Sequence, residues 1–183
     1  VLYHAIQREY GVTTYVAGED IPDVWKGMQV TGDAKMLLVR VEFADVKFED
    51  SKIYSEEDFY EMIMGNGDKG DDFPYESLNA YYKRSSYNKL NIISDKVYSC
   101  TLSKNRYEYE WENFGEQDLI KEVMEMLDDT VDFADYDAND DGQLDGICIN
   151  FAGENTGWGS TWWSHKYDFL DSSIIFDGVT PGG

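Results

Sequence analysis

Residues 135–146 of this sequence read DYDANDDGQLDG and carry oxygen-bearing side chains at every second position. If Asp137 is position 1 of a loop, positions 3, 5, 7 and 9 also hold acidic or amide residues, and Gly142 stands at position 6, where a calcium loop turns sharply. Calcium takes its oxygen ligands from carboxylates, amides and one backbone carbonyl at this spacing. The predicted calcium ligands are Asp137, Asn139, Asp141, Gln143 and Asp145.

The loop is not a complete EF-hand. Position 12, where an EF-hand has a bidentate Glu, is Cys148. A bound ion would take its remaining ligands from Asp132, Asp135, Asp140, another part of the fold, or water. Without that Glu we expect a weak site, suited to the millimolar calcium found outside cells. The alternative interpretation is a solvated turn ahead of a strand, which Asp, Asn and Gly also favour.

The chain is strongly acidic. It has 183 residues, with 37 Asp and Glu against 15 Lys and Arg, a formal net charge of -22, and no basic stripe. Nucleic acid and anionic membrane surfaces are therefore poor partners. The hydrophobic share of 42% and the aromatic share of 15% are those of a folded protein, and the length suits one domain with a proper core.

The cysteines and the N-terminal residues bear on metal binding, membrane insertion and secretion. Cys100 and Cys148 belong to no CxxC pair, which excludes a zinc cluster and leaves either buried free thiols or one disulfide. No run of about 18 apolar residues predicts a membrane span, so no membrane insertion is expected. The first residues lack signal-peptide features, so a secreted form would already be processed. We assign residues 1–34 to an N-terminal segment, a linker or propeptide remnant, and residues 35–183 to one domain.

Apolar and β-branched runs predict the strands. Residues 36–43 form the best candidate for a central strand, and residues 146–153 predict a second buried strand. Residues 89–102 predict one or two strands or a hairpin. Together with the helices, this order predicts an α/β or α+β domain with a mixed sheet.

Helices are predicted where apolar residues recur at helical spacing. One covers residues 55–65 with Ser55 as its N-cap, and another covers residues 75–87, opened by Pro74. A short helix is also expected near residues 2–9. The most periodic helix is residues 116–129. Its predicted apolar stripe consists of Leu119, Val123, Met126 and Leu127.

Four segments, taken in order, resemble a known family. They are residues 36–48 (MLLVRVEFADVKF), 76–92 (ESLNAYYKRSSYNKLNI), 131–153 (VDFADYDANDDGQLDGICINFAG) and 162–166 (WWSHK). This set is similar to the amino-terminal half of the catalytic domain in the immune inhibitor A family of secreted zinc metallopeptidases. The most specific part is the segment that contains the calcium loop. The resemblance spans roughly residues 35–167.

The resemblance implies a calcium-stabilised endopeptidase exported by bacteria, with protein or peptide substrates. In such enzymes the catalytic zinc is held by an HExxH helix, whose Glu acts as general base. This sequence has no HExxH and only two histidines, His4 and His165. We therefore expect the chain alone to be inactive. It is then either a fragment, whose partner is the missing C-terminal segment of its own domain, or a natural non-catalytic relative.

His165 and the Trp-rich segment 153–166 leave alternatives open. His165 has either a catalytic or metal-binding role, or a packing or cleft-wall role beside its aromatic neighbours. Trp158, Trp162 and Trp163 are either core residues or a stacking surface for sugar or peptide. The second possibility defines a different class of function, a calcium-stabilised extracellular binding module without catalysis.

Overall fold

The computed structural model describes residues 28–48, 55–65, 75–110, 115–158, 160–166, 169–171 and 173–181. The helix expected near residues 2–9, His4 and Pro74 lie outside these ranges. The first described strand begins at Gly32, just before the start assigned to the domain.

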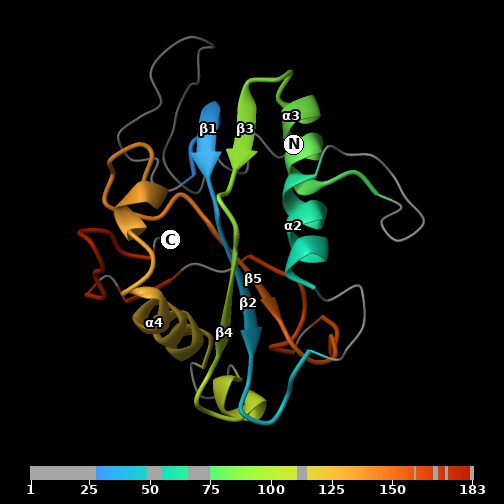
Figure 1. Cartoon of the computed structure of the whole chain (residues 1–183), viewed down its shortest axis with the longest axis vertical. Coiled ribbons are helices and arrows are strands. Elements are labelled where there is room, and N and C mark those ends of the chain that lie inside the picture. Colours follow the sequence, from blue (N-terminus) through green and yellow to red (C-terminus); the bar gives the residue numbers. More distant parts are fainter. Residues whose placement is uncertain are drawn as a thin grey trace, which may run out of the picture.

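Five parallel strands form the centre of the described part of the chain (Figure 1). They are β1 (Gly32–Lys35), β2 (Leu37–Glu42), β3 (Leu90–Ile93), β4 (Val97–Thr101) and β5 (Ile147–Phe151). β1 pairs with β3, and β2 lies between β4 and β5. β1 leads into β2 across one residue, Met36, whose N–H donates to the Ile93 carbonyl at 2.8 Å. The β1–β3 ladder therefore continues into the ladder of β2, β4 and β5, and all five strands run in the same direction.

The α/β class is confirmed, but the named strand pairs are all parallel where a mixed sheet was predicted. The hairpin alternative for residues 89–102 is wrong for the same reason. β3 and β4 are two strands, and the three residues between them do not reverse the chain. Because parallel strands cannot be joined by a tight turn, helices must carry the crossovers.

β2 is the central strand of its ladder, as predicted, and its first half is buried on both faces. Leu37, Val39 and Val41 join the core cluster that contains α4, whereas Leu38 joins the cluster on the opposite face. A strand covered on both faces has no solvent side for polar residues. This explains the apolar start of the strand, while Arg40 and Glu42 toward its end are only half-buried.

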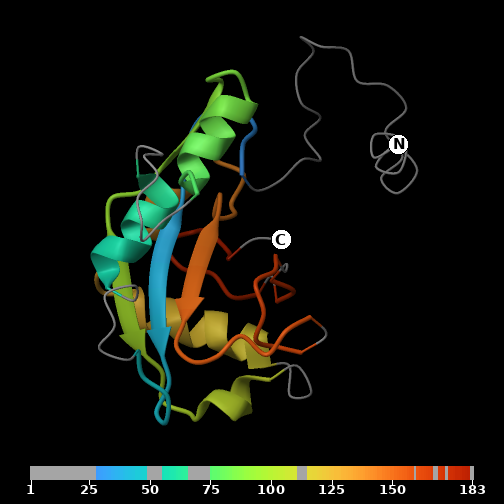
Figure 2. The ribbon, with the colours of Figure 1, turned by 90° about the vertical axis from the view of Figure 1, so that its right-hand side faces the viewer.

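Helices α2 (Glu56–Met64) and α3 (Leu78–Ser85) lie on one face of the sheet (Figures 1 and 2). Ser55 caps α2 as predicted, accepting from the Asp58 N–H at 3.0 Å, and Phe59 is buried against the strands. α3 begins three residues later than predicted, because the Ser77 hydroxyl accepts from the Ala80 N–H at 3.1 Å and so fixes the start of the helix.

Helix α4 (Gly115–Leu127) lies on the other face of the sheet (Figures 1 and 2). Three members of the predicted stripe are buried, but Met126 is 46% exposed, and Met124 is buried in its place. Relative to the predicted stripe, the buried side of the helix therefore extends toward Met124. At about 100° per residue, Met124 and Met126 lie on opposite sides of Val123.

β5 departs from the prediction of a second buried strand. It is an edge strand of the three-stranded ladder, and all five of its residues are only half-buried. Cys148 on β5 stands opposite Leu38, while Cys100 on β4 stands opposite Val41. The two cysteines thus flank β2 from opposite sides and are both free, which excludes the disulfide. Burial raises the pKa of each thiol to about 11.

Candidate metal centre

The predicted calcium loop lies between a short 3-10 helix, η4 (Phe133–Tyr136), and β5. Phe133 and Tyr136 are buried and anchor η4 in the core. The Asp145 N–H donates to the Tyr136 carbonyl at 2.7 Å and closes the base of the loop. The core therefore fixes both ends of residues 137–145.

The side chains at positions 1, 3 and 5 turn inward and accept hydrogen bonds from the loop backbone. The two carboxylate oxygens of Asp137 accept from the N–H groups of Asp141 and Gly142, at 3.0 and 2.8 Å. Asn139 Oδ1 also accepts from the Asp141 N–H, at 3.2 Å, and Asp141 Oδ1 accepts from the Gln143 N–H at 2.9 Å. These bonds curl the loop around its own ligand-type oxygens.

The sharp turn occurs at Gly142, the position that the ligand spacing predicted. Gly142 has a φ of +81°, and Asp140 has a φ of +55°, so both occupy the left-handed region. No atom lies within 4 Å of a Cβ built on Gly142. Glycine is therefore needed at this position for its backbone conformation and not for space.

Asp145 is the most unusual member of the set. It is 4% exposed, and its Oδ2 is 3.4 Å from the backbone N–H groups of Lys35 and Ala138. Its Oδ1 is buried and has no hydrogen-bond partner among the described residues. Burial raises the pKa of Asp145; the two backbone N–H groups lower it, and the charges of Asp137 and Asp141 raise it further. A buried oxygen that lacks a donor is a natural ligand for a cation.

The other aspartates proposed as additional ligands have different partners. Asp132 caps η4 by accepting from the Ala134 N–H at 3.2 Å. Asp135 lies 3.6 Å from the Lys35 ammonium, which lies 2.8 Å from Asp95. This ammonium therefore serves Asp95 and Asp135, while only the backbone N–H of Lys35 faces Asp145.

The donor chemistry fits calcium, but the carboxylates do not form a closed ligand cage. Within the residues that the structure describes, no three His, Cys, Asp or Glu side chains form a group that could hold a metal ion. Asn139 and the Gln143 carbonyl are outside that set of residue types, and Asp137 and Asp141 are occupied by backbone N–H groups. Calcium binding would draw the oxygens together from this loop conformation.

His165 contacts two residues through three interactions. Its Nδ1 lies 2.7 Å from the Trp163 carbonyl and its Nε2 lies 3.0 Å from Glu116 on α4. The imidazole also stacks on the Trp163 ring, with 5.0 Å between centroids. With both ring nitrogens occupied in this way, the packing role has geometric support.

The three tryptophans of segment 153–166 have three different environments. Trp162 is 4% exposed and packs against Phe43 and Phe151, so it is a core residue. Trp163 is half-buried beside His165. Trp158, in contrast, is 87% exposed. Of these three tryptophans, Trp158 is therefore the one whose ring is available for stacking.

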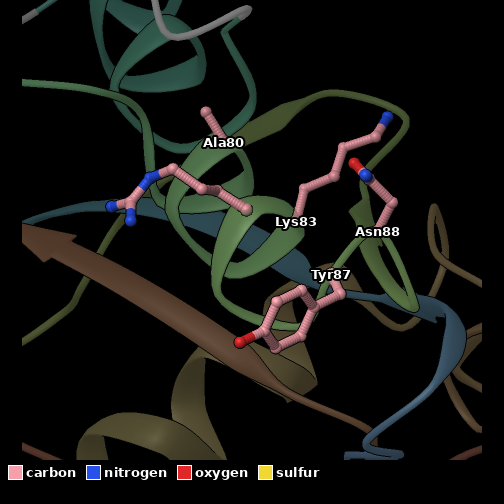
Figure 3. A pocket seen from close by; sticks show the side chains of 5 residues that line it. Ala80, Lys83, Tyr87 and Asn88 are labelled. Atoms are coloured by element: carbon pink, nitrogen blue, oxygen red, sulfur yellow. The ribbon is translucent and has the colours of Figure 1, made fainter.

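A shallow hollow of about 550 Å³ lies on the outer side of α3 (Figure 3). It is lined by Ala80, Lys83, Arg84, Tyr87 and Asn88. Arg84 is paired with Glu76, and the two cations stand in the last turn of α3, where they oppose the negative end of the helix dipole. Helix stabilisation accounts for these charges, so the hollow is not assigned a ligand.

No protein-family model matches this chain, and a search of curated proteins found no match. Among the helices that the structure describes, none is long and apolar enough to cross a membrane. The structure itself shows the fold class, an α/β domain whose parallel strands are covered on both faces. A fold class of this kind does not define a function.

Two features of the candidate site could not be found from sequence. The unpaired Oδ1 of Asp145 depends on the way β1 passes beside the loop, because Lys35 supplies a backbone N–H to the other oxygen. The bridge between Gln143 and Thr180 joins segments far apart in the chain. Neither feature leaves a local sequence pattern.

Proposed function

We propose that this chain is the calcium-binding part of a secreted zinc metalloendopeptidase that hydrolyses peptide bonds in proteins. The resemblance of four ordered segments to the immune inhibitor A family supplies the enzyme class. The calcium assignment comes from the loop itself, with its five ligand positions and its glycine at position 6.

The observation that carries the proposal is the buried, unpaired Oδ1 of Asp145 inside a loop already curled around Asp137, Asn139 and Asp141. A solvated turn has no reason to bury a carboxylate beside two other carboxylates, because desolvation and repulsion both oppose it. A divalent cation offsets both costs. Calcium is the cation that this oxygen-only set favours.

The residues of this chain do not fit a catalytic zinc site. The sequence has no HExxH, and His165 is engaged with Trp163 and Glu116. Under the proposal, the zinc ligands and the general base belong to sequence outside these 183 residues. The role of the present chain is to provide the sheet and the calcium-stabilised loop that support that site.

The test is to titrate calcium into the purified chain by isothermal calorimetry and to repeat the titration with magnesium. The proposal predicts one calcium site per chain, with an affinity in the range of extracellular sites, about 10⁻⁴ to 10⁻³ M. It also predicts no peptide hydrolysis by the chain alone, and hydrolysis by the parent protein. A natural stop codon directly after Gly183 in the coding sequence would contradict the enzyme assignment.

One observation favours a second candidate, a calcium-stabilised extracellular binding module for peptide or carbohydrate. Trp158 is 87% exposed in a turn closed by hydrogen bonds between Thr156, Gly157 and Ser160. An indole that is presented to solvent is a suitable stacking surface. Quenching of tryptophan fluorescence by a panel of glycans and peptides tests it. Loss of the quenching in Trp158→Ala, with no hydrolysis, would favour this candidate over the first.

A further inference from the structure

A segment near the end of the described chain, residues 176–180, contacts the calcium loop on one side and η4 on the other. Phe176 and Val179 exchange backbone hydrogen bonds, both 2.9 Å long, around Asp177 and Gly178. Both of these turn residues have positive φ, +50° and +88°. The segment is therefore a tight two-residue turn with a defined shape.

One side of this turn holds the second half of the loop. The Thr180 N–H donates to the Gly142 carbonyl, and the Leu144 N–H donates to the Thr180 carbonyl, both at 3.0 Å. Thr180 thus pairs with Gln143 as in a parallel strand. This pairing fixes the backbone at position 7 of the loop, whose carbonyl is an expected calcium ligand.

The other side of the turn holds the helix ahead of the loop. Asp177 Oδ2 accepts from the Phe133 N–H at 2.9 Å, at the start of η4. The rings of Phe133 and Phe176 lie 5.6 Å apart, and Val179 is 4% exposed in the same core. The turn therefore connects η4, which leads into position 1, to the loop backbone at positions 6 to 8.

We propose that residues 176–180 form a brace that positions the backbone of the calcium loop for metal binding, so that calcium affinity and the order of this segment depend on each other. The inference rests on the calcium site proposed above. This loop lacks the Glu that an EF-hand has at position 12. In its place, the brace fixes the backbone of the second half of the loop. By linkage, whatever the brace adds to calcium affinity, calcium adds to the stability of the brace.

Two pairs of variants test the brace by calcium titration. Thr180→Pro removes the N–H that donates to Gly142, and its control Thr180→Ala keeps the backbone unchanged. Asp177→Gly removes the acceptor for Phe133 but tolerates the positive φ, and its control Asp177→Asn keeps an acceptor oxygen. We expect T180P and D177G to weaken calcium binding by roughly 5-fold or more, and each control to stay within roughly 2-fold of the unmodified chain.

Hydrogen exchange of the unmodified chain gives a second measurement that needs no variant. Calcium should slow exchange in residues 132–137 and 173–181, while residues 56–64 of α2 serve as the control region and should not change. Calcium binding with no added protection of residues 173–181, or equal affinities of T180P and T180A, would overturn the brace alone. An unmodified chain that binds no calcium would overturn the site itself, and the brace with it.

Discussion

The loops at the two ends of β5 are built on different principles. The loop before β5 gathers Asp137, Asp141 and Asp145 and leaves one buried carboxylate oxygen of Asp145 without a donor. The segment after β5 is closed by neutral groups, with the Thr156 N–H donating to the Trp162 carbonyl at 2.7 Å. Among the described residues, the loop before β5 therefore has a buried acceptor that lacks a donor, and the segment after β5 has none.

The segment after β5 also has its own cation. Arg106 lies 4.4 Å from the ring of Trp162 and donates through Nη2 to the Glu154 carbonyl at 2.6 Å. Among the described residues of this region, the buried groups without a hydrogen-bond partner are donors, Arg106 Nε and Trp163 Nε1, and donors do not bind metal ions. Under the proposed function, the loop before β5 therefore depends on an external ion, whereas the described part of the segment after β5 does not.

Trp162 should give the largest effect on stability. Trp162→Ala removes a buried side chain that packs on Phe43 and Phe151, and should lower the free energy of unfolding by about 3–5 kcal/mol. Because this end of β5 does not depend on an ion, the loss should be equal in calcium and in chelator. Urea denaturation under both conditions measures it. A loss that differs between the two conditions would break the contrast between the loops.

Asp141→Ala should give the next largest effect, and a larger one in calcium than in chelator, because the hydrogen bond from the Gln143 N–H is lost under both conditions. An ion at 100 times its dissociation constant adds about 2.7 kcal/mol, so loss of the site should lower the melting temperature by roughly 5–10 °C. The variant should also become insensitive to chelator. Asp129→Asn, which changes an exposed aspartate outside the loop, is the matched control and should keep the response to calcium. An unchanged melting curve for D141A would refute the site.

Asp145→Asn should have opposite effects in the presence and absence of calcium. The pKa of Asp145 is raised in the folded state, so its contribution to stability is complete below the unfolded pKa and is lost as the pH rises through the folded pKa. Without calcium at neutral pH the ionised carboxylate is destabilising, and D145N should gain about 1 kcal/mol. With calcium the variant should instead lose affinity.

Thermal melts of D145N and the unmodified chain in chelator, from about pH 4 to pH 8, test this sign. The gain from the substitution should grow as the pH rises. A variant that is less stable than the unmodified chain in chelator at neutral pH would mean that the carboxylate is already satisfied without an ion.

Trp158→Ala should give the smallest effect on stability. The side chain is 87% exposed, so its removal should change the free energy of unfolding by no more than about 0.5 kcal/mol. Denaturation of this variant beside W162A sharpens the distinction between the exposed and core tryptophans of one segment. A large loss in W158A would show that the indole packs against another part of the protein.

Sequence patterns were sufficient where structure is decided locally. The central strand, the Ser55 cap and most of the α4 stripe follow from apolar periodicity and capping chemistry. The glycine turn of the loop follows from its spacing. These features depend on residues within a few positions of one another.

The misjudged features depend on contacts that are distant in sequence. Met124 is buried in place of Met126 because the sheet sets the orientation of α4, and β5 is half-buried because of its edge position. The strands are parallel because helices join them, which the apolar runs alone do not reveal. The contact of Thr180 with Gly142 is made by backbone atoms, which leave no trace in residue type.

The most direct test of the account is a metal analysis of the purified chain combined with its intact mass. After equilibration in millimolar calcium, we predict one calcium and no zinc per chain of 183 residues, with the calcium lost in D141A. No bound calcium, together with a melting temperature that chelator does not change, would contradict the central claim that the loop before β5 requires an ion.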